Sequence, residues 1–319
     1  LEHVVLLDEG RVIADASVDD LRDAATEVSG RAGDVRAFAA DRETLQLQTL
    51  GSLATATVRG DRVAVFLSQS LELPVAHLAA FRAALISIPL FALFGEDALE
   101  FRLSNSAAKA IITDEAGWEK IAKIRDRLPE LKSVYIVGDE TPPGTKPFWG
   151  AIKSASPDFA TVDTSADDPA LIIYTSGTTG NPKGALHAHR VVLGHLPNVE
   201  MCHNFLPRPG DLMWTPADWA WIGGLINGLF AFWYHGIPMV GHRARKFEPQ
   251  AAMQMMAELG IRNVFLPPTA LKLMRQADVK NSGVRLRSIF TGGESLGGEL
   301  LECGARHARG ETEGLHRCA

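Results

Sequence analysis

Short apolar runs alternate with longer amphipathic segments through most of this chain, and this rhythm constrains the fold more than any other feature. Between residues 62 and 137 the apolar runs are RVAVFL, ISIPL, KAIIT and SVYIV, with segments of helical character between them. Between residues 170 and 290 the pattern returns in ALIIY, DLMWTP, IPMV, RNVFL and LRSIF. Buried strands that alternate with helices are typical of parallel sheets covered on both faces. The sequence therefore predicts an α/β fold.

The chain is predicted to change character at about residue 58. Before it, HVVLLDEGRVIAD is expected to form two short strands, and SVDDLRDAA a helix capped by Ser17. The stretch GDETPPGTKPFWGAIKSASPDF is rich in Pro, Gly and Ser and is expected to connect two halves of the main domain. We predict an appendage at residues 1–58, a main domain at 59–302 and a tail at 303–319.

Composition narrows the class of protein. The net charge of −6 gives no support to nucleic-acid binding. The three cysteines, Cys202, Cys303 and Cys318, form no disulfide framework, which favours a reducing compartment such as the cytoplasm. The most apolar run, WIGGLINGLFAFWYHGIPMV, is interrupted by Asn227 and Pro238 and is interpreted as a buried helix and a strand, so no membrane span is expected.

The stretch YTSGTTGNPKG follows directly after the strand predicted at residues 171–174, where α/β sheets place their ligands. Glycines allow tight turns, hydroxyls donate hydrogen bonds and a lysine supplies a positive charge, so the composition suits a polyphosphate. The residues concerned are Thr175, Ser176, Gly177, Thr178, Thr179, Gly180, Lys183 and Gly184. The spacing does not match a Walker A loop, because Pro182 replaces the second glycine. A flexible surface loop is the alternative.

This stretch resembles the signature loop of the AMP-forming acyl-CoA synthetases and their adenylate-forming relatives. GDRVAVFLSQSLELPVAHLAAFRAALISIPLF is similar to the first strand-helix-strand unit of that family. GDLMWTPADWAWIGGL is similar to its acyl-pocket segment, and FTGGESLGGELLE to its adenine-side strand and turn. The resemblance runs from about Arg59 to Glu302. It implies two parallel β-sheets flanked by helices, as in the N-terminal domain of these enzymes.

The resemblance also implies a reaction and a site. The family joins a carboxylate to the AMP moiety of ATP, releases pyrophosphate and passes the acyl group to coenzyme A. ATP, Mg²⁺, coenzyme A and a small carboxylic acid, such as acetate or a fatty acid, are therefore the expected ligands. By the resemblance, the loop residues Thr175, Ser176, Gly177, Thr178, Thr179, Gly180 and Lys183 hold the pyrophosphate part of ATP, with Thr178 and Lys183 catalytic. Gly292, Gly293 and Glu294 line the adenine side, and Trp219, Trp221 and Gly223 the acyl side.

The chain departs from the family pattern at both ends. After ELLE the family continues to a Tyr-Gly-x-Thr-Glu motif whose carboxylate is the expected magnesium ligand, whereas this chain reads CGARHARGETEGLHRCA. The ribose-binding aspartate, the hinge and the small C-terminal domain with its catalytic lysine are also missing from the sequence. Residues 1–58 resemble instead the tail of an ABC transporter ATP-binding subunit. We expect a truncated N-terminal synthetase domain, incomplete at its C-terminus and inactive or impaired.

Other interpretations of these residues stay open. A non-catalytic fusion or frameshift product that at most binds nucleotide is the alternative to an enzyme. The aromatic residues between Trp214 and Trp233 could form an ordinary core. Four histidines, His187, His189, His195 and His203, lie close in sequence, but their spacing matches no metal motif.

Overall fold

A computed structural model describes residues 3–8, 11–17, 26–31, 44–50, 53–58, 61–175, 181–244, 246–277, 279 and 283–293. The chain divides into two compact units. Unit 1 comprises Leu1–Leu67 and Glu72–Arg190, and unit 2 comprises Ser68–Leu71 and Val191–Ala319. The predicted boundaries at residues 58 and 302 stay predictions.

Unit 1 is built on a seven-stranded sheet with the order β10-β9-β8-β6-β7-β11-β12. Its strands are β6 (Arg62–Phe66), β7 (Ile86–Pro89), β8 (Ala110–Asp114), β9 (Ser133–Val137), β10 (Lys146–Pro147), β11 (Pro169–Thr175) and β12 (Lys183–Ala188). All neighbours are parallel except β11 and β12, which pair antiparallel. The predicted α/β fold is confirmed, and β12 is an addition that the apolar pattern did not predict, because its residues are exposed or half-buried.

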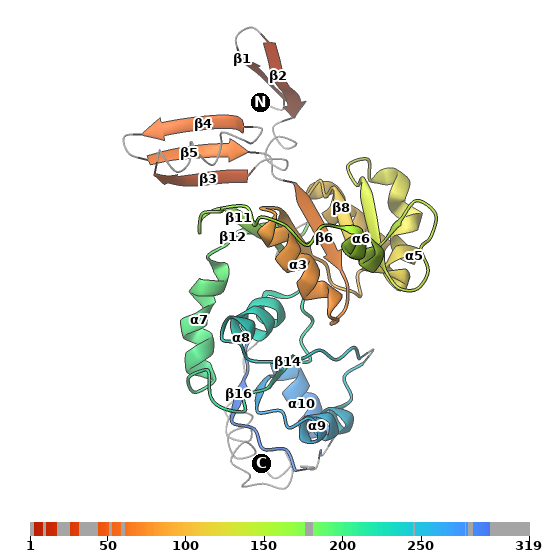
Figure 1. The fold of residues 1–319 in the computed structure, drawn as a ribbon, viewed down its shortest axis with the longest axis vertical. Coiled ribbons are helices and arrows are strands. Elements are labelled where there is room, and N and C mark those ends of the chain that lie inside the picture. The colour runs from red at the N-terminus through yellow and green to blue at the C-terminus, as the bar shows by residue number, and fades with distance from the viewer. Residues whose placement is uncertain are drawn as a thin grey trace. The chain divides into compact units, whose positions relative to one another are not determined.

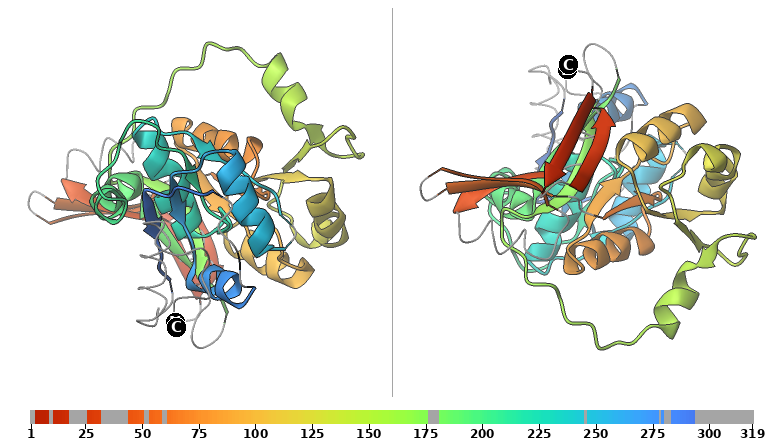
Figure 2. Two further views of the ribbon diagram at one scale, coloured as in Figure 1. Left: turned by 90° about the horizontal axis from the view of Figure 1, so that it is seen from below. Right: turned by 90° about the horizontal axis from the view of Figure 1, so that it is seen from above.

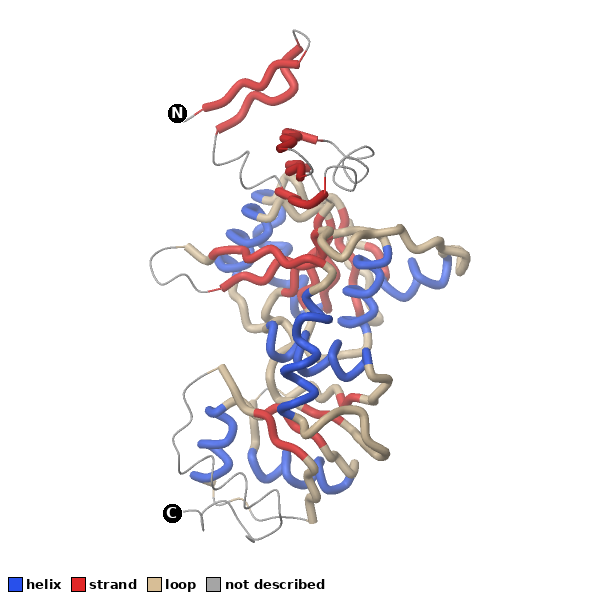
Figure 3. Tube along the Cα trace, turned by 90° about the vertical axis from the view of Figure 1, so that its left-hand side faces the viewer, coloured by secondary structure: helices blue, strands red, loops and turns tan. Residues whose placement is uncertain are grey.

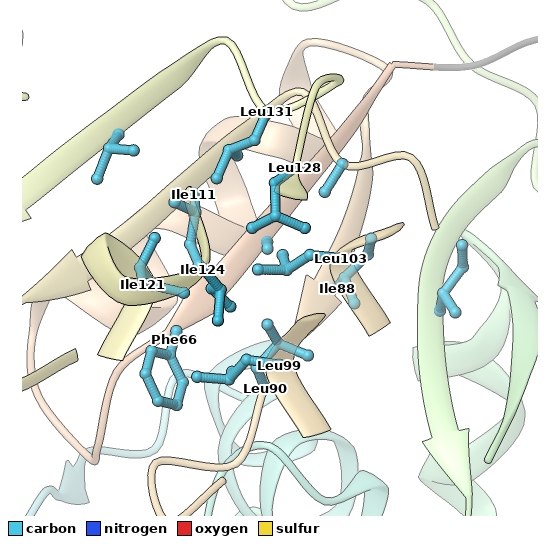
Figure 4. Close-up of a cluster of buried hydrophobic side chains, with 14 of the residues drawn as sticks. Phe66, Ile88, Leu90, Leu99, Leu103, Ile111, Ile121, Ile124, Leu128 and Leu131 are labelled. Carbon is cyan, nitrogen blue, oxygen red and sulfur yellow. The ribbon is translucent and has the colours of Figure 1, made fainter. Parts of the chain in front are cut away.

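Helices flank this sheet: α3 (Glu72–Arg82), α4 (Glu96–Asn105), α5 (Glu115–Ile124) and α6 (Phe148–Ser154), with a short 3₁₀ turn at Arg125–Arg127. The side chain of Asp114 caps α5, because its Oδ1 accepts the backbone N–H of Gly117 at 2.9 Å. Figure 4 shows the core of this unit, in which Leu99 and Leu103 of α4 and Ile121 of α5 meet the strand residues Phe66 and Ile111.

The predicted connection at residues 138–159 lies within unit 1 and not between the two units, and it contains the short strand β10 and the helix α6. Beyond α6 the chain runs as a long arc back to β11 (Figure 2). Residues 156–163 of this arc are exposed, in keeping with their polar and proline-containing sequence.

Unit 2 holds a second, four-stranded sheet with the order β14-β13-β15-β16, parallel throughout. Its strands are β13 (Met213–Trp214), β14 (Met239–Val240), β15 (Asn263–Phe265) and β16 (Ser288–Phe290). Its helices are α7 (Val191–Cys202), the π-helix η2 (Gly223–Phe230), α8 (Ala231–Tyr234), α9 (Pro249–Glu258) and α10 (Pro268–Gln276), and most are labelled in Figure 1. Two sheets flanked by helices are therefore present, as the resemblance implied; the sheet of unit 2 is parallel, whereas that of unit 1 is parallel except for the β11–β12 pair.

The first sixty residues contain strands. β1 (His3–Asp8) and β2 (Arg11–Ser17) form the predicted antiparallel pair. β3 (Thr26–Arg31), β4 (Thr44–Leu50) and β5 (Leu53–Val58) form a three-stranded antiparallel sheet that the sequence analysis did not predict. The helix predicted from Ser17 includes residues 18–25, which lie outside the described residues, and Ser17 itself ends β2.

Within the described ranges, no helix is both long and apolar enough to cross a membrane. The apolar run at residues 221–240 is divided between η2, α8 and β14, as the interpretation of a buried helix and a strand requires.

Candidate functional site

The signature loop joins β11 to β12, and the structure brings its two ends together. Thr175 ends β11, Lys183 begins β12, and the two residues are register partners in the antiparallel pair shown in Figure 3. The hydroxyl of Thr175 donates to the backbone oxygen of Lys183 at 3.4 Å. Both side chains are exposed, so the Lys183 ammonium and the Thr175 hydroxyl are accessible to a ligand.

The base of this hairpin is anchored to the core of unit 1. Tyr174 is buried, and its hydroxyl donates to Asn105 Oδ1 at 2.7 Å and lies 3.2 Å from the backbone oxygen of Arg102. Opposite Tyr174, a Cβ on Gly184 would lie 2.9 Å from the side chain of Ile172. Gly184 therefore lets β12 pass close over β11 directly after Lys183.

Several residues of the predicted site lie outside the described residues: Ser176, Gly177, Thr178, Thr179, Gly180 and Glu294. Thr175 and Lys183 belong to unit 1, whereas Gly292, Gly293, Trp219, Trp221 and Gly223 belong to unit 2.

The acyl-side segment of unit 2 carries two tryptophans in different environments. Trp219 is 3% exposed. Its ring packs against Gly241, since a Cβ added to Gly241 would lie 3.2 Å from Cη2 of Trp219. Its buried indole N–H has no hydrogen-bond partner among the described residues. Trp221 is 44% exposed. Trp219 thus presents a buried donor without an acceptor, whereas Trp221 is open to solvent.

Asp218 precedes these tryptophans and is a polar group that the sequence analysis passed over. Asp218 Oδ1 accepts a hydrogen bond from the backbone N–H of Ala220 at 2.7 Å. The backbone oxygen of Asp218 accepts a hydrogen bond from the backbone N–H of Trp221 at 3.1 Å. Burial raises the pKa of the Asp218 carboxyl to about 6, although the Ala220 hydrogen bond acts in the opposite direction. Asp218 organises the turn that places both tryptophans.

A pair of phenylalanines links the acyl-side segment to the adenine-side segment. A Cβ on Gly223 would lie 3.1 Å from the ring of Phe265. Phe265 stacks on Phe290 with ring centroids 5.0 Å apart, and a Cβ on Gly292 would lie 3.7 Å from Phe290. Gly293 has a φ of +96°, a conformation that favours glycine. Contact through Phe265 and Phe290 therefore joins two segments that are 69 positions apart (292 − 223).

The sequence signals for these linking residues were weak. Phe265 and Phe290 each end an apolar run and were interpreted only as strand residues. Asp218 is the one of these residues that the sequence could have pointed to, because its carboxylate stands next to two tryptophans.

The remaining aromatic residues of this region divide by burial. Trp214, Phe230 and Phe232 are at most 5% exposed and belong to the interior, whereas Trp233 is 37% exposed. The interior set matches the alternative interpretation of an ordinary core.

The histidines considered as metal ligands in the sequence have different partners in the structure. His195 Nδ1 lies 2.5 Å from Asn227 Oδ1, His203 Nδ1 lies 2.7 Å from Ser288 Oγ, and His189 packs edge-on against Phe81. Among the described residues, no three His, Cys, Asp or Glu side chains are grouped so that they could hold a metal ion.

The fold and the loop define the class of protein. Residues 53–312 match the family model of AMP-binding enzymes, and the chain belongs to this family.

Curated relatives are acyl-activating enzymes. The chain is 33% identical over 254 residues to the acetyl-coenzyme A synthetase of Bacillus subtilis (strain 168), covering 77% of this chain and 43% of that protein. It is 31% identical over 248 residues to the mitochondrial acyl-coenzyme A synthetase ACSM4 of Rattus norvegicus, covering 76% and 42%. The chain thus spans less than half the length of these relatives.

Solved structures show the same fold. An acyl-CoA synthetase from Brucella canis superposes with a TM-score of 0.67 at 24% identity, covering 97% of this chain and 52% of that one. The anthranilate CoA ligase AuaEII, solved with anthranoyl-AMP, superposes with a TM-score of 0.71 at 17% identity, covering 92% and 53%.

Proposed function

We propose that this chain is a domain of an ATP-dependent acyl-CoA synthetase that binds ATP and a small carboxylic acid, and that its adenylation chemistry is impaired or absent. The observation that carries the proposal is the pairing of Thr175 with Lys183 at the two ends of the loop TSGTTGNPK, in a member of the AMP-binding family. The pairing brings a hydroxyl and an ammonium to the loop at the carboxyl end of β11, where α/β sheets bind ligands.

The proposed reaction has two steps. A carboxylate oxygen of the acid attacks the α-phosphorus of ATP, a new C–O–P linkage forms, and the bond to pyrophosphate breaks. The thiol of coenzyme A then attacks the acyl carbon, and AMP leaves. The first step concentrates negative charge on the leaving pyrophosphate, so donors fixed near it stabilise the transition state.

The residues of this chain take defined roles in the proposal. Lys183 and the hydroxyls of Thr175, Ser176, Thr178 and Thr179 offset the pyrophosphate charge, with Lys183 and Thr178 nearest the reaction. Gly292, Gly293 and Glu294 receive the adenine. Trp219, Trp221 and Gly223 receive the acyl group. The unpartnered indole N–H of Trp219 supports a polar ligand on that side, because buried indole groups usually find an acceptor.

Mg²⁺ is expected with ATP, and proteins usually hold it through one or two carboxylates and the substrate phosphates. The described residues contain no grouped set of three possible metal ligands. We therefore assign no step of the mechanism to the ion.

ATP binding to the full chain tests the first part of the proposal. Because hydrogen bonds to charged groups contribute about 1.5–3 kcal/mol, Lys183→Ala is expected to weaken ATP binding at least about tenfold by isothermal titration calorimetry. Lys153→Ala, a change at an exposed lysine of α6, is the matched control and should bind as the wild type does. Equal affinities of the wild type and Lys183→Ala would contradict the assignment of the loop.

Pyrophosphate release tests the second part, with acetate through octanoate as acids and with coenzyme A present. Slow acid-dependent release supports an impaired acyl-CoA synthetase domain, and robust thioester formation by this chain alone would contradict the impairment. ATP binding without release supports the alternative of a non-catalytic nucleotide-binding protein. Absence of ATP binding contradicts the proposal and favours the alternative of a non-catalytic fusion or frameshift product, which at most binds nucleotide.

We also propose a cytoplasmic location, on the ground that the three cysteines form no disulfide framework. Recovery of the protein with the membranes after cell fractionation would contradict it. The resemblance of residues 1–58 to the tail of an ABC transporter subunit stays a prediction, and co-purification with a permease would support it.

A further inference from the structure

Gln69 is a buried side chain for which the proposed reaction has no use. It lies in the segment Ser68–Leu71, which belongs to unit 2 although β6 and α3 on either side belong to unit 1. Gln69 is 8% exposed. Its Nε2 donates to the backbone oxygens of Thr215 at 3.0 Å and Ala217 at 2.8 Å, and its Oε1 accepts the backbone N–H of His242 at 3.1 Å.

These three bonds join two segments that both adjoin Trp219. Residues 215–217 lead directly into the turn of Asp218 and Trp219. On the other side, Gly241 is the residue over which the ring of Trp219 packs, and it immediately precedes His242. Gln69 therefore fixes the position of the segment before Trp219 relative to the segment that packs against the Trp219 ring.

The loop at residues 215–217 has further anchors, because it continues β13, in which Trp214 is the register partner of Val240 in β14 and of Val264 in β15. The Thr215 hydroxyl donates to the backbone oxygen of Phe265 at 2.7 Å and accepts the N–H of Ala217 at 3.0 Å. That hydroxyl ties the loop to the carboxyl end of β15, but it makes no bond to the Gly241–His242 segment. Among the described residues, it is the Gln69 side chain that accepts a hydrogen bond from the backbone N–H of His242.

We propose that Gln69 is a positioning residue for the acyl side of the site: it sets the place of Trp219 by clamping residues 215–217 to His242. This inference rests on the proposed function, since it assumes that Trp219 receives the acyl group. An amide is the side chain that suits this task, because one group must donate twice and accept once. A glutamate at this position would have no donor for the carbonyl oxygens of Thr215 and Ala217. A methionine would make none of the three hydrogen bonds.

The position of Trp219 is measurable without any ligand, by ¹⁹F NMR of the full chain labelled with 5-fluorotryptophan. Trp219→Phe identifies the Trp219 resonance. Gln69→Met and Gln69→Glu are each expected to shift this resonance and to leave those of Trp118 and Trp149 in unit 1 in place. Gln254→Met, at an exposed glutamine of α9, should move none of them. An unmoved Trp219 resonance in Gln69→Met overturns the inference.

Hydrogen exchange of the wild type provides a test that does not depend on whether a variant folds. The side chain of His242 and the neighbouring Ala244 are both exposed. The His242 amide is nevertheless expected to exchange at least about tenfold more slowly than the Ala244 amide, because it is hydrogen-bonded to Gln69. Equal exchange rates would show that the clamp does not persist in solution and overturn the inference.

Affinity separates this inference from the proposed function. An acyl-sulfamoyl adenosine, which mimics the acyl-adenylate, is expected to bind Gln69→Met about tenfold more weakly than the wild type, while ATP affinity stays the same. Equal loss of both ligands, or no loss of either, contradicts a positioning role on the acyl side. If the wild type binds neither ligand, the proposed function fails, and the NMR and exchange results alone decide the role of Gln69.

Discussion

Individual buried polar groups in unit 2 have pKa values displaced in opposite directions. Burial raises the pKa of Asp218 to about 6, whereas burial and the nearby Arg287 lower the pKa of His203 to about 4. Each shift favours the neutral form, because a charge loses hydration when it is buried. Both groups thus make the stability of the protein depend on pH, with opposite signs.

Asp218 should make the folded state less stable as the pH rises. Its folded-state pKa is above the ordinary value of 3.8 for an aspartate, so the stabilisation is complete below about 4 and is lost as the pH rises through about 6. Asp218→Asn keeps the acceptor for the Ala220 N–H and removes the titration. Urea unfolding at several pH values is expected to show that the variant gains stability relative to the wild type, by about 2–3 kcal/mol, across this range. A pH-independent difference would contradict the burial of the carboxyl.

At the scale of elements, the turn at Asp218 and the π-helix η2 depend on each other. A Cβ on Gly224 would collide with the backbone oxygen of Asp218, and a Cβ on Gly228 would lie 3.2 Å from the side chain of Thr215. The sequence predicted a helix here from its apolar residues, but not its π form. The helical form depends on how closely the turn packs against it, and helical periodicity carries no information about that contact.

Two glycine substitutions should therefore have opposite effects. Gly224→Ala is expected to destabilise the chain, because backbone must move to admit the new methyl group. Gly194→Ala, in α7, has no atom within 4 Å of the new Cβ and is expected to stabilise by roughly 0.5–1 kcal/mol. Thermal unfolding of both variants checks this pair, and a stable Gly224→Ala would mean that the turn is not packed on η2.

The strand β12 shows the same limit of pattern-based prediction. Its residues from Lys183 to Leu186 are exposed, so no alternation of apolar and polar residues marks it as a strand. It forms by pairing with β11, and this pairing places Lys183 beside Thr175. The chemistry of the loop was recognisable in the sequence, whereas the strand that presents its lysine was not.

At the scale of the whole molecule, the chain has a separate core in each unit. Leu99 lies in the core of unit 1, and Leu271 lies in a core of unit 2 with Met253 and Val264. Proteins with more than one domain commonly unfold in more than one step. Each core is expected to stabilise mainly its own unit.

Cavity-forming substitutions in the two cores test this independence. Leu99→Ala and Leu271→Ala should each remove about 2–5 kcal/mol of stability. Hydrogen exchange read by mass spectrometry is expected to increase in α4 and β8 for the first variant, and in α9 and α10 for the second. If either variant raised exchange equally in both units, the chain would unfold as one cooperative body.

The α/β class, the positions of most strands and helices after residue 61, and the family could all be inferred from the sequence alone, because each depends on local periodicity or on one contiguous motif. The tertiary structure decided which residues support the site. Gln69 finds its partners 146 to 173 positions away, and Phe265 of β15 stacks on Phe290 of the adjacent strand β16 and lies beside Gly223. Such contacts exist only after the chain has closed on itself, and nothing in the local pattern around Gln69 distinguishes it from an ordinary loop residue.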